Sequence, residues 1–165
     1  MLFKSKIKVC DFANCLIREH VAIFGRRRFD YICKQFDLHF RNEPSYIEAF
    51  YEFQAFGLYS IIDWVRTQCG HGHSLRAEIL TSLNERFADI SGPNWETMRL
   101  RVAEYEESGK AAPNGGLAAR RIFARPPGVF QPSSMEAFEL SHNMNSSYLD
   151  AGKVIGGLFK QYKFE

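Results

Sequence analysis

Cys69, His71 and His73 are the residues whose types and spacing come closest to a site of reactive chemistry. Thiolate and imidazole groups are common zinc ligands, but a structural zinc site needs four ligands, usually as two spaced pairs. The other three histidines stand alone in the sequence and supply no second pair. Gly70 suits the position that follows a helix C-terminus, where the helix dipole also favours histidine. The stretch therefore predicts the end of a helix, with a metal site as the alternative.

Two basic clusters are interleaved with aromatic side chains. Their arginines are Arg26, Arg27 and Arg28 in the first cluster and Arg120, Arg121 and Arg125 in the second. Basic and aromatic residues together suit contact with phosphates and stacking on bases. No helix-turn-helix, RRM, KH or zinc-finger pattern accompanies them. The clusters are therefore interpreted as solvated surface. Nucleic-acid binding through Arg26, Arg27, Arg28, Arg120 and Arg121 is the alternative.

The sequence holds no catalytic motif. We find no HExxH, no GxSxG, no phosphate-binding loop and no ExxH pair of the kind that binds two irons in a helical bundle. His20, Asp63 and Cys33 could meet in space, but lone polar residues on apolar helices are usually satisfied core groups. The sequence therefore favours a non-enzymatic protein and calls for no cofactor.

The charges of the chain are unevenly distributed, although its net charge is only +2. Residues 1–41 carry nine Lys or Arg against four Asp or Glu, whereas residues 42–110 carry six against eleven. The basic part could pair with the acidic part within one molecule or across a dimer.

Composition indicates one folded domain in the cytoplasm. The 165 residues, 45% hydrophobic and 15% aromatic, suffice for a sizeable core. The opening residues lack the apolar region of a signal peptide. The longest uncharged apolar run, Phe53–Ile62, is too short to cross a membrane. The four cysteines form no CxxC pattern and are interpreted as reduced thiols.

Apolar periodicity predicts an all-α bundle of about six or seven helices around a central aromatic-rich helix at about residues 45–68. Ser45 and Glu48 form a capping box that predicts the start of this helix. A Pro/Gly-rich connection at about 109–132 contains one short helix, and the last helix runs on to about Tyr162. The stretch SHNMNSS, residues 141–147, is a poor helix former and indicates an interruption there. No segment predicts a strand.

More helix faces are apolar than packing around one central helix requires. This surplus favours a protein that interacts with others through its helix faces. Trp95, Met98, Val102 and Tyr105 form a narrow seam, and Gly152 and Gly156 open one face of the last helix to a close neighbour. These six residues predict a homodimer or a contact with another protein. The alternative is a small-molecule-sensing domain, because an aromatic bundle centre lined by Phe53, Tyr59 and Trp64 can enclose an apolar ligand.

Overall fold

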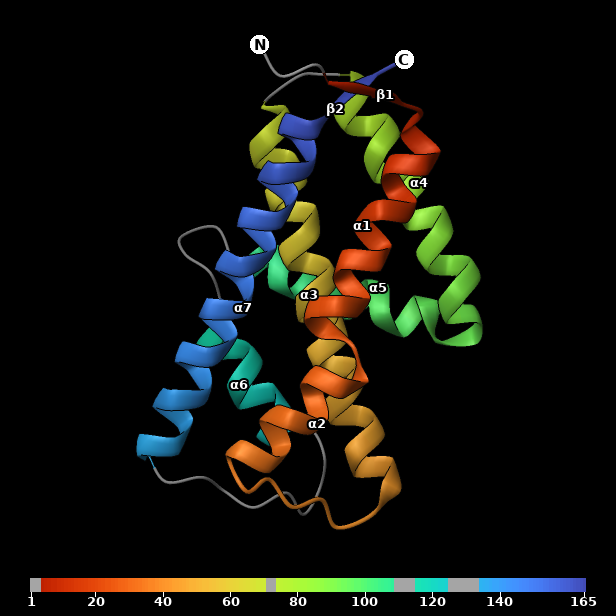
Figure 1. Cartoon of the computed structure of the whole chain (residues 1–165). Coiled ribbons are helices and arrows are strands. Elements are labelled where there is room, and N and C mark those ends of the chain that lie inside the picture. The colour runs from red at the N-terminus through yellow and green to blue at the C-terminus, as the bar shows by residue number, and fades with distance from the viewer. Residues whose placement is uncertain (1–3, 71–73, 109–114, 125–133) are drawn as a thin grey trace.

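The computed structural model describes residues 4–70, 74–108, 115–124 and 134–165. The elements among these residues are β1 (Ser5–Ile7), α1 (Val9–Phe24), α2 (Arg26–Gln35), α3 (Glu43–Cys69), α4 (Ser74–Ser91), the 3-10 turn η1 (Gly92–Asn94), α5 (Trp95–Ser108), α6 (Gly115–Ala124), α7 (Ser134–Gln161) and β2 (Tyr162–Phe164). The two strands lie together at one end of the bundle (Figure 1). The rest of the predicted connection at about 109–132, outside α6, lies outside the described residues. No helix in the described part of the chain has an apolar stretch long enough to cross a bilayer.

Helix α3 is the centre of the bundle, as predicted. It contacts each of the other six α-helices, and Figure 1 shows it running behind α1 and α7 along the long axis. Phe53 on α3 lies against Phe24 of α1 and Phe29 of α2, with ring centroids 5.5 and 5.4 Å apart. All three rings are fully buried. The prediction of an all-α bundle around an aromatic-rich helix is confirmed.

Gly57 lets α1 approach α3 closely. A Cβ at this position would lie 2.4 Å from the Phe24 ring, so no other residue fits without moving one of the two helices. The close contact stabilises the core through dispersion and offsets the cost of about 1 kcal/mol for glycine inside a helix.

Helix α3 begins earlier than predicted. Its N-cap is Asn42, whose side-chain oxygen accepts a hydrogen bond from the Ser45 backbone N–H at 2.9 Å, and Pro44 lies in the first turn. The predicted capping box of Ser45 and Glu48 is therefore wrong. Proline suits the first turn because its missing N–H would have no intrahelical partner there.

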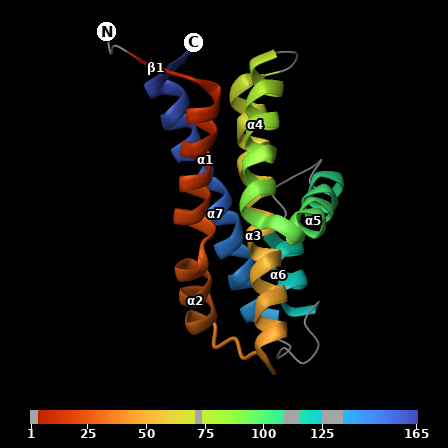
Figure 2. The same ribbon diagram turned by 90° about the vertical axis from the view of Figure 1, so that its right-hand side faces the viewer.

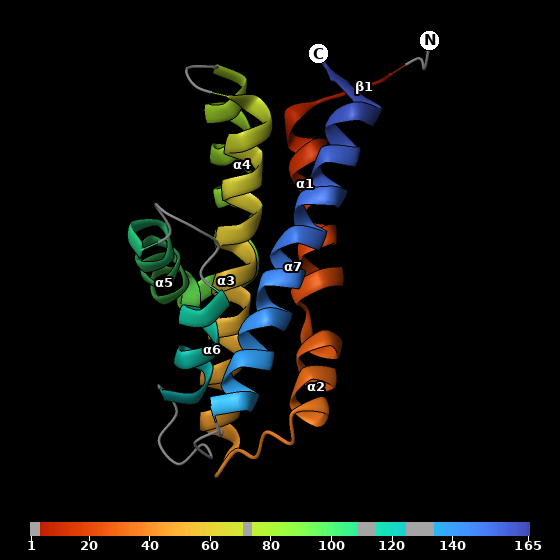
Figure 3. The same ribbon diagram turned by 90° about the vertical axis from the view of Figure 1, so that its left-hand side faces the viewer.

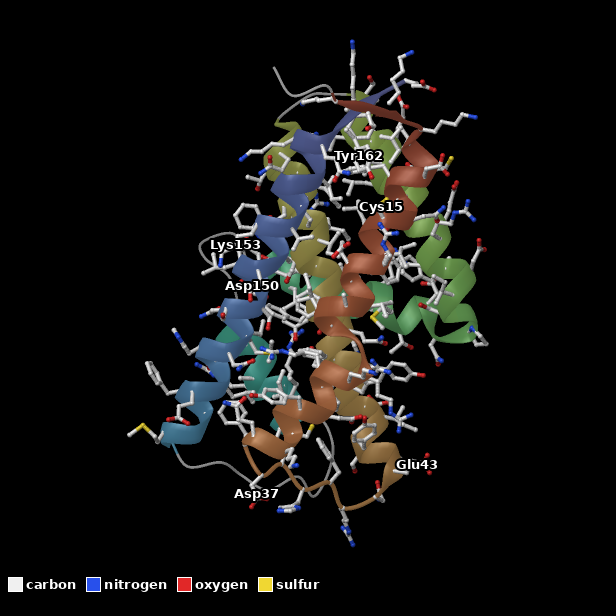
Figure 4. The ribbon with its side chains drawn as sticks, in the orientation of Figure 1. Cys15, Asp37, Glu43, Asp150, Lys153 and Tyr162 are labelled. Atoms are coloured by element: carbon white, nitrogen blue, oxygen red, sulfur yellow. The ribbon has the colours of Figure 1, made fainter. Side chains whose placement is uncertain are left out.

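Helix α7 continues through residues 141–147, so the predicted interruption is wrong. Ser141 and Ser147 each donate their hydroxyl to the carbonyl four residues earlier, at 2.8 and 3.1 Å. This back-bonding keeps the serines compatible with a helix. Asp150 and Lys153, an exposed ion pair of 3.0 Å, mark the outer face of α7 in Figure 4.

The sequence did not predict the two strands. Ser5–Ile7 pairs in parallel with Tyr162–Phe164, so the pairing joins the two ends of the described chain. Tyr162, the first residue of β2, is labelled in Figure 4. The rings of Phe159 and Phe164 pack edge-on against Phe12, at 4.9 and 4.8 Å. Three-residue strands with such distant partners leave no periodic signal.

The chain turns sharply from α4 through η1 into α5. Figures 2 and 3 show α5 projecting sideways from the bundle, whereas α1, α3, α4 and α7 run along it. Helix α4 packs mainly on α1, and α5 packs mainly on α3. The α4–α5 corner therefore lies against both α1 and α3, and a cavity is found there.

Candidate functional site

A cavity of 180 Å³ lies at the α4–α5 corner, between four helices. Its walls are Ile17, His20 and Val21 of α1, Tyr51 and Gln54 of α3, Phe87, Ile90 and Ser91 of α4, Asn94 of η1, and Met98 of α5. None of these side chains is a carboxylate, a lysine or an arginine. Five of the ten residues are apolar and five are polar, and apolar atoms make up most of the wall surface.

His20 is the most buried polar side chain of this cavity, with only 2% of its surface exposed. It follows Cys15, labelled on α1 in Figure 4, by five residues. Its Nε2 lies 3.1 Å from the Gln54 carbonyl oxygen, and the Phe87 ring meets the imidazole edge-on at 4.9 Å. Two neighbouring helices therefore fix the position of the ring.

The His20 imidazole is neutral near pH 7. Burial lowers the pKa of His20 from 6.5 to about 4, and the hydrogen bond to the Gln54 carbonyl opposes part of that shift. Desolvation acts this way because it disfavours the charged ring. A neutral imidazole can donate through one nitrogen and accept through the other.

Tyr51 supplies a second polar group to the cavity. Its hydroxyl accepts a hydrogen bond from Asn94 Nδ2 at 2.9 Å. This bond links α3 to η1 and therefore to the corner that closes the cavity. Val21 and Ile90, 59% and 66% exposed, stand at the rim. The exposed part of the lining is therefore made of these two apolar side chains and the polar Asn94.

Two larger hollows have a different character. One of 240 Å³ lies between α3, α4 and α5, and two of its three charged residues, Arg66 and Glu106, pair with each other at 2.8 Å. One of 310 Å³ lies beside the sheet and is flanked by the exposed Lys4 and Lys163. Neither is lined by a polar side chain as buried as His20.

A buried ionic cluster joins α3, α5 and α6. At its centre Glu52 of α3 is fully buried and accepts a hydrogen bond from the Tyr105 hydroxyl. Arg101 Nε lies 3.9 Å from one Glu52 oxygen, and Arg121 Nη1 lies 3.8 Å from the other. The Arg121 guanidinium also lies 4.9 Å from the centre of the Tyr105 ring.

Each arginine of this cluster has a second carboxylate. Arg101 donates to Glu48, and Arg121 Nη1 lies 2.7 Å from Glu104 Oε2. The side chains of Glu48 and Glu104 are about half exposed, so both outer pairs lie at the surface. The cluster therefore clamps three helices together.

Of the three residues predicted to bind a ligand, Phe53 and Tyr59 lie in the core, and Trp64 is partly buried and packs against it. Phe53 and Tyr59 are buried, and none of the three lines the cavities described above. Trp64 donates its Nε1–H to the Tyr148 carbonyl at 3.0 Å. The residues of α3 that line the 180 Å³ cavity are Tyr51 and Gln54.

The residues of the predicted interface lie mostly inside this molecule. Met98, Val102 and Tyr105 are buried, whereas Trp95 is half-buried and lines the 240 Å³ hollow. A Cβ on Gly152 would lie 2.3 Å from the Trp64 ring of the same chain. A Cβ on Gly156 would meet only Gln68 Nε2, at 3.7 Å. The close approach at Gly152 is therefore to α3.

The arginines predicted to contact nucleic acid lie on two helices, α2 and α6. Arg26 and Arg28 lie near the rings of Tyr46 and Tyr31, at 5.6 and 5.4 Å, and Arg28 also donates to Asn143 at 3.4 Å. Arg27 and Arg120 are exposed. Arg121 belongs to the ionic cluster, so it is not free to contact a phosphate.

Helix α3 ends at Cys69, with Gly70 in a positive-φ conformation at its C-cap (φ 68°). The helix end predicted from Gly70 is confirmed. His71 and His73 lie outside the described residues. Within the described part of the chain, no group of three His, Cys, Asp or Glu side chains could hold a metal ion. Burial also raises the pKa of the Cys69 thiol, which disfavours the thiolate that binds metals.

His20 and Asp63 have separate hydrogen-bond partners, and the structure does not join either of them to Cys33. Asp63 accepts from the Tyr148 hydroxyl at 2.5 Å, and His20 bonds to Gln54. No hydrogen bond or ion pair joins any two of the three.

Comparisons of the chain with known protein families, with curated proteins and with solved structures found no match.

Proposed function

We propose that this protein is a non-enzymatic helical domain that binds a small molecule in the cavity at the α4–α5 corner. The observation that carries the proposal is the presence of His20, a polar side chain 2% exposed, on the wall of an otherwise mostly apolar cavity of 180 Å³. Pockets for small molecules typically combine apolar walls with a few polar groups that fix orientation.

The size of the cavity limits its ligand to about one ring. Apolar cavities of about 150 Å³ hold benzene, and sites for drug-sized ligands begin at about 300 Å³. Four helices supply the walls, so an occupant would contact α1, α3, α4 and α5 at once. Binding would then stabilise one arrangement of these helices, which is how a sensing domain responds to its ligand.

Filling the cavity should weaken binding. Ile17→Phe places a larger side chain on the wall, so we expect the affinity for a one-ring probe such as toluene to fall by about tenfold or more. Titrations followed by ¹H–¹⁵N NMR measure that affinity. Leu80→Phe is the matched control, because Leu80 is also half-buried but lines the 240 Å³ hollow. Equal weakening by both variants, or no response of the wild-type protein, would contradict the proposal.

A second candidate function is self-association through opposite charges. Among the described residues no ion pair joins residues 1–41 to residues 42–110. The basic and acidic parts of the chain are therefore not paired with each other within the described molecule. Pairing between two copies, with each basic part facing the acidic part of the other, would satisfy both in a twofold dimer.

Such a dimer should dissociate in salt. We expect light scattering to give the dimer mass at low salt and the monomer mass near 1 M salt, where charges are screened beyond about 3 Å. Arg27→Glu should weaken the dimer, and Arg120→Glu, an equally exposed change outside residues 1–41, should not. A monomer at every salt and protein concentration would exclude self-association.

A further inference from the structure

The hydrogen bond of His20 determines which of its nitrogens is available to a ligand. The Gln54 carbonyl oxygen can only accept, so His20 Nε2, 3.1 Å away, carries the proton. In the neutral ring the proton-free Nδ1 is then an acceptor. No hydrogen bond to Nδ1 is found among the described residues. Because His20 lines the cavity, Nδ1 is the ring atom left to accept a hydrogen bond from a donor bound there.

Tyr51 offers the complementary group. Its hydroxyl oxygen already accepts from Asn94 Nδ2 at 2.9 Å, which leaves the hydroxyl proton to be donated. No acceptor for this proton lies within hydrogen-bonding distance in the described part of the chain. The cavity is therefore lined by one residue with an acceptor left over and by one with a donor left over, and a hydroxyl group can pair with either.

The walls also restrict the charge of the ligand. They carry no carboxylate that could balance an ammonium group and no lysine or arginine that could balance an acid. An ion would lose its hydration there without a partner, which is costly. The rings of Phe87 and Tyr51 and the side chains of Ile17 and Met98 instead suit an apolar body.

We propose that the ligand is a small neutral alcohol of about the size of phenol, whose hydroxyl donates a hydrogen bond to His20 Nδ1. The inference rests on the proposed function, because it names the ligand class of the same cavity. The apolar ring would lie among the apolar walls, and the Tyr51 hydroxyl would donate to the oxygen of the ligand.

Phenol and toluene test the inference on the wild-type protein, because they have the same number of heavy atoms and only phenol donates a hydrogen bond. We expect phenol to bind about tenfold more tightly, although it is the less apolar of the two. The ¹⁵N resonance of His20 Nδ1 should shift when phenol binds and stay nearly unchanged with toluene. That resonance reports on the nitrogen directly, so it separates a hydrogen bond from simple filling of the cavity.

His20→Leu removes the acceptor and should reverse the preference, so that toluene binds more tightly than phenol. Tyr51→Phe removes only the hydrogen bond from the Tyr51 hydroxyl to the ligand oxygen, so it should lower the affinity for phenol by a smaller factor. Equal binding of phenol and toluene to the wild-type protein would overturn the alcohol inference and leave the ligand-binding proposal standing. No binding of either probe at millimolar concentration would overturn both.

Discussion

Replacement of Arg101 by methionine should lower the free energy of unfolding by about 3–5 kcal/mol, because it removes one of the two arginines that the described residues place beside a buried carboxylate. Arg101 is 5% exposed and Glu52 is fully buried. After the change, Arg121, 3.8 Å from Glu52, is the remaining cation of the described cluster near that side chain. Urea denaturation, with circular dichroism as the readout, measures the loss.

The companion variants separate charge from packing. Adding Glu52→Gln to Arg101→Met should recover part of the loss, since a neutral amide no longer needs a cation beside it. Arg99→Met is the matched control on α5, because Arg99 pairs with Glu96 in an exposed contact. Arg99→Met should lower the free energy of unfolding by no more than about 0.5 kcal/mol. Equal losses for Arg99→Met and Arg101→Met would show that the cluster does not hold α5 in place.

The sequence contained a signal for the ionic cluster that apolar patterning does not detect. Arg101 follows Met98 by three residues and precedes Tyr105 by four, so helical periodicity places it on the buried face of α5. Glu52 has the same relation to Ala49 and Phe56 on α3. A count of apolar residues alone passes over both positions. A search for opposite charges at inward positions of two helices would have found them.

The architecture could be predicted because α3 carries apolar residues on more than one face. That pattern requires neighbours on every side, and the structure places all the other helices around it. Gly57 was also informative, since a helical glycine that costs stability indicates a close neighbour. The pairing of β1 with β2 could not be predicted, because each strand has only three residues and its partner lies at the other end of the chain.

The cavity could not be predicted for a related reason. Its walls come from residues of five elements, and the volume between them depends on the angle at which η1 turns α5 away from α4. Periodicity reveals which face of a helix is buried but not whether the facing side chains fill the space. The sequence therefore predicts Phe53, Tyr59 and Trp64 as pocket residues without showing whether neighbouring side chains fill the space beside them; in the structure Phe53 and Tyr59 are buried and Trp64 packs against the core.

Acid should destabilise this protein through His20, by about 3 kcal/mol between pH 6.5 and pH 4. The pKa of His20 is lowered to about 4 by burial, whereas in the unfolded chain it returns to 6.5. Between these values the unfolded state binds a proton that the folded state does not. The contribution of the neutral His20 to the free energy of unfolding is therefore fully present above pH 6.5. It is lost as pH falls toward 4, at up to about 1.4 kcal/mol per pH unit.

The difference between two unfolding profiles isolates this contribution from that of the carboxylates. His20→Gln keeps an N–H donor for the Gln54 carbonyl but does not titrate, so its free energy of unfolding should depend less on pH from 7 to 4.5. His142→Gln, an exposed change on α7, should leave the wild-type profile unaltered. Urea unfolding at each pH gives the three profiles. Parallel profiles for the wild-type protein and His20→Gln would mean that His20 is solvated in the folded state, and then the acceptor at Nδ1 could not be the buried group on which ligand recognition depends.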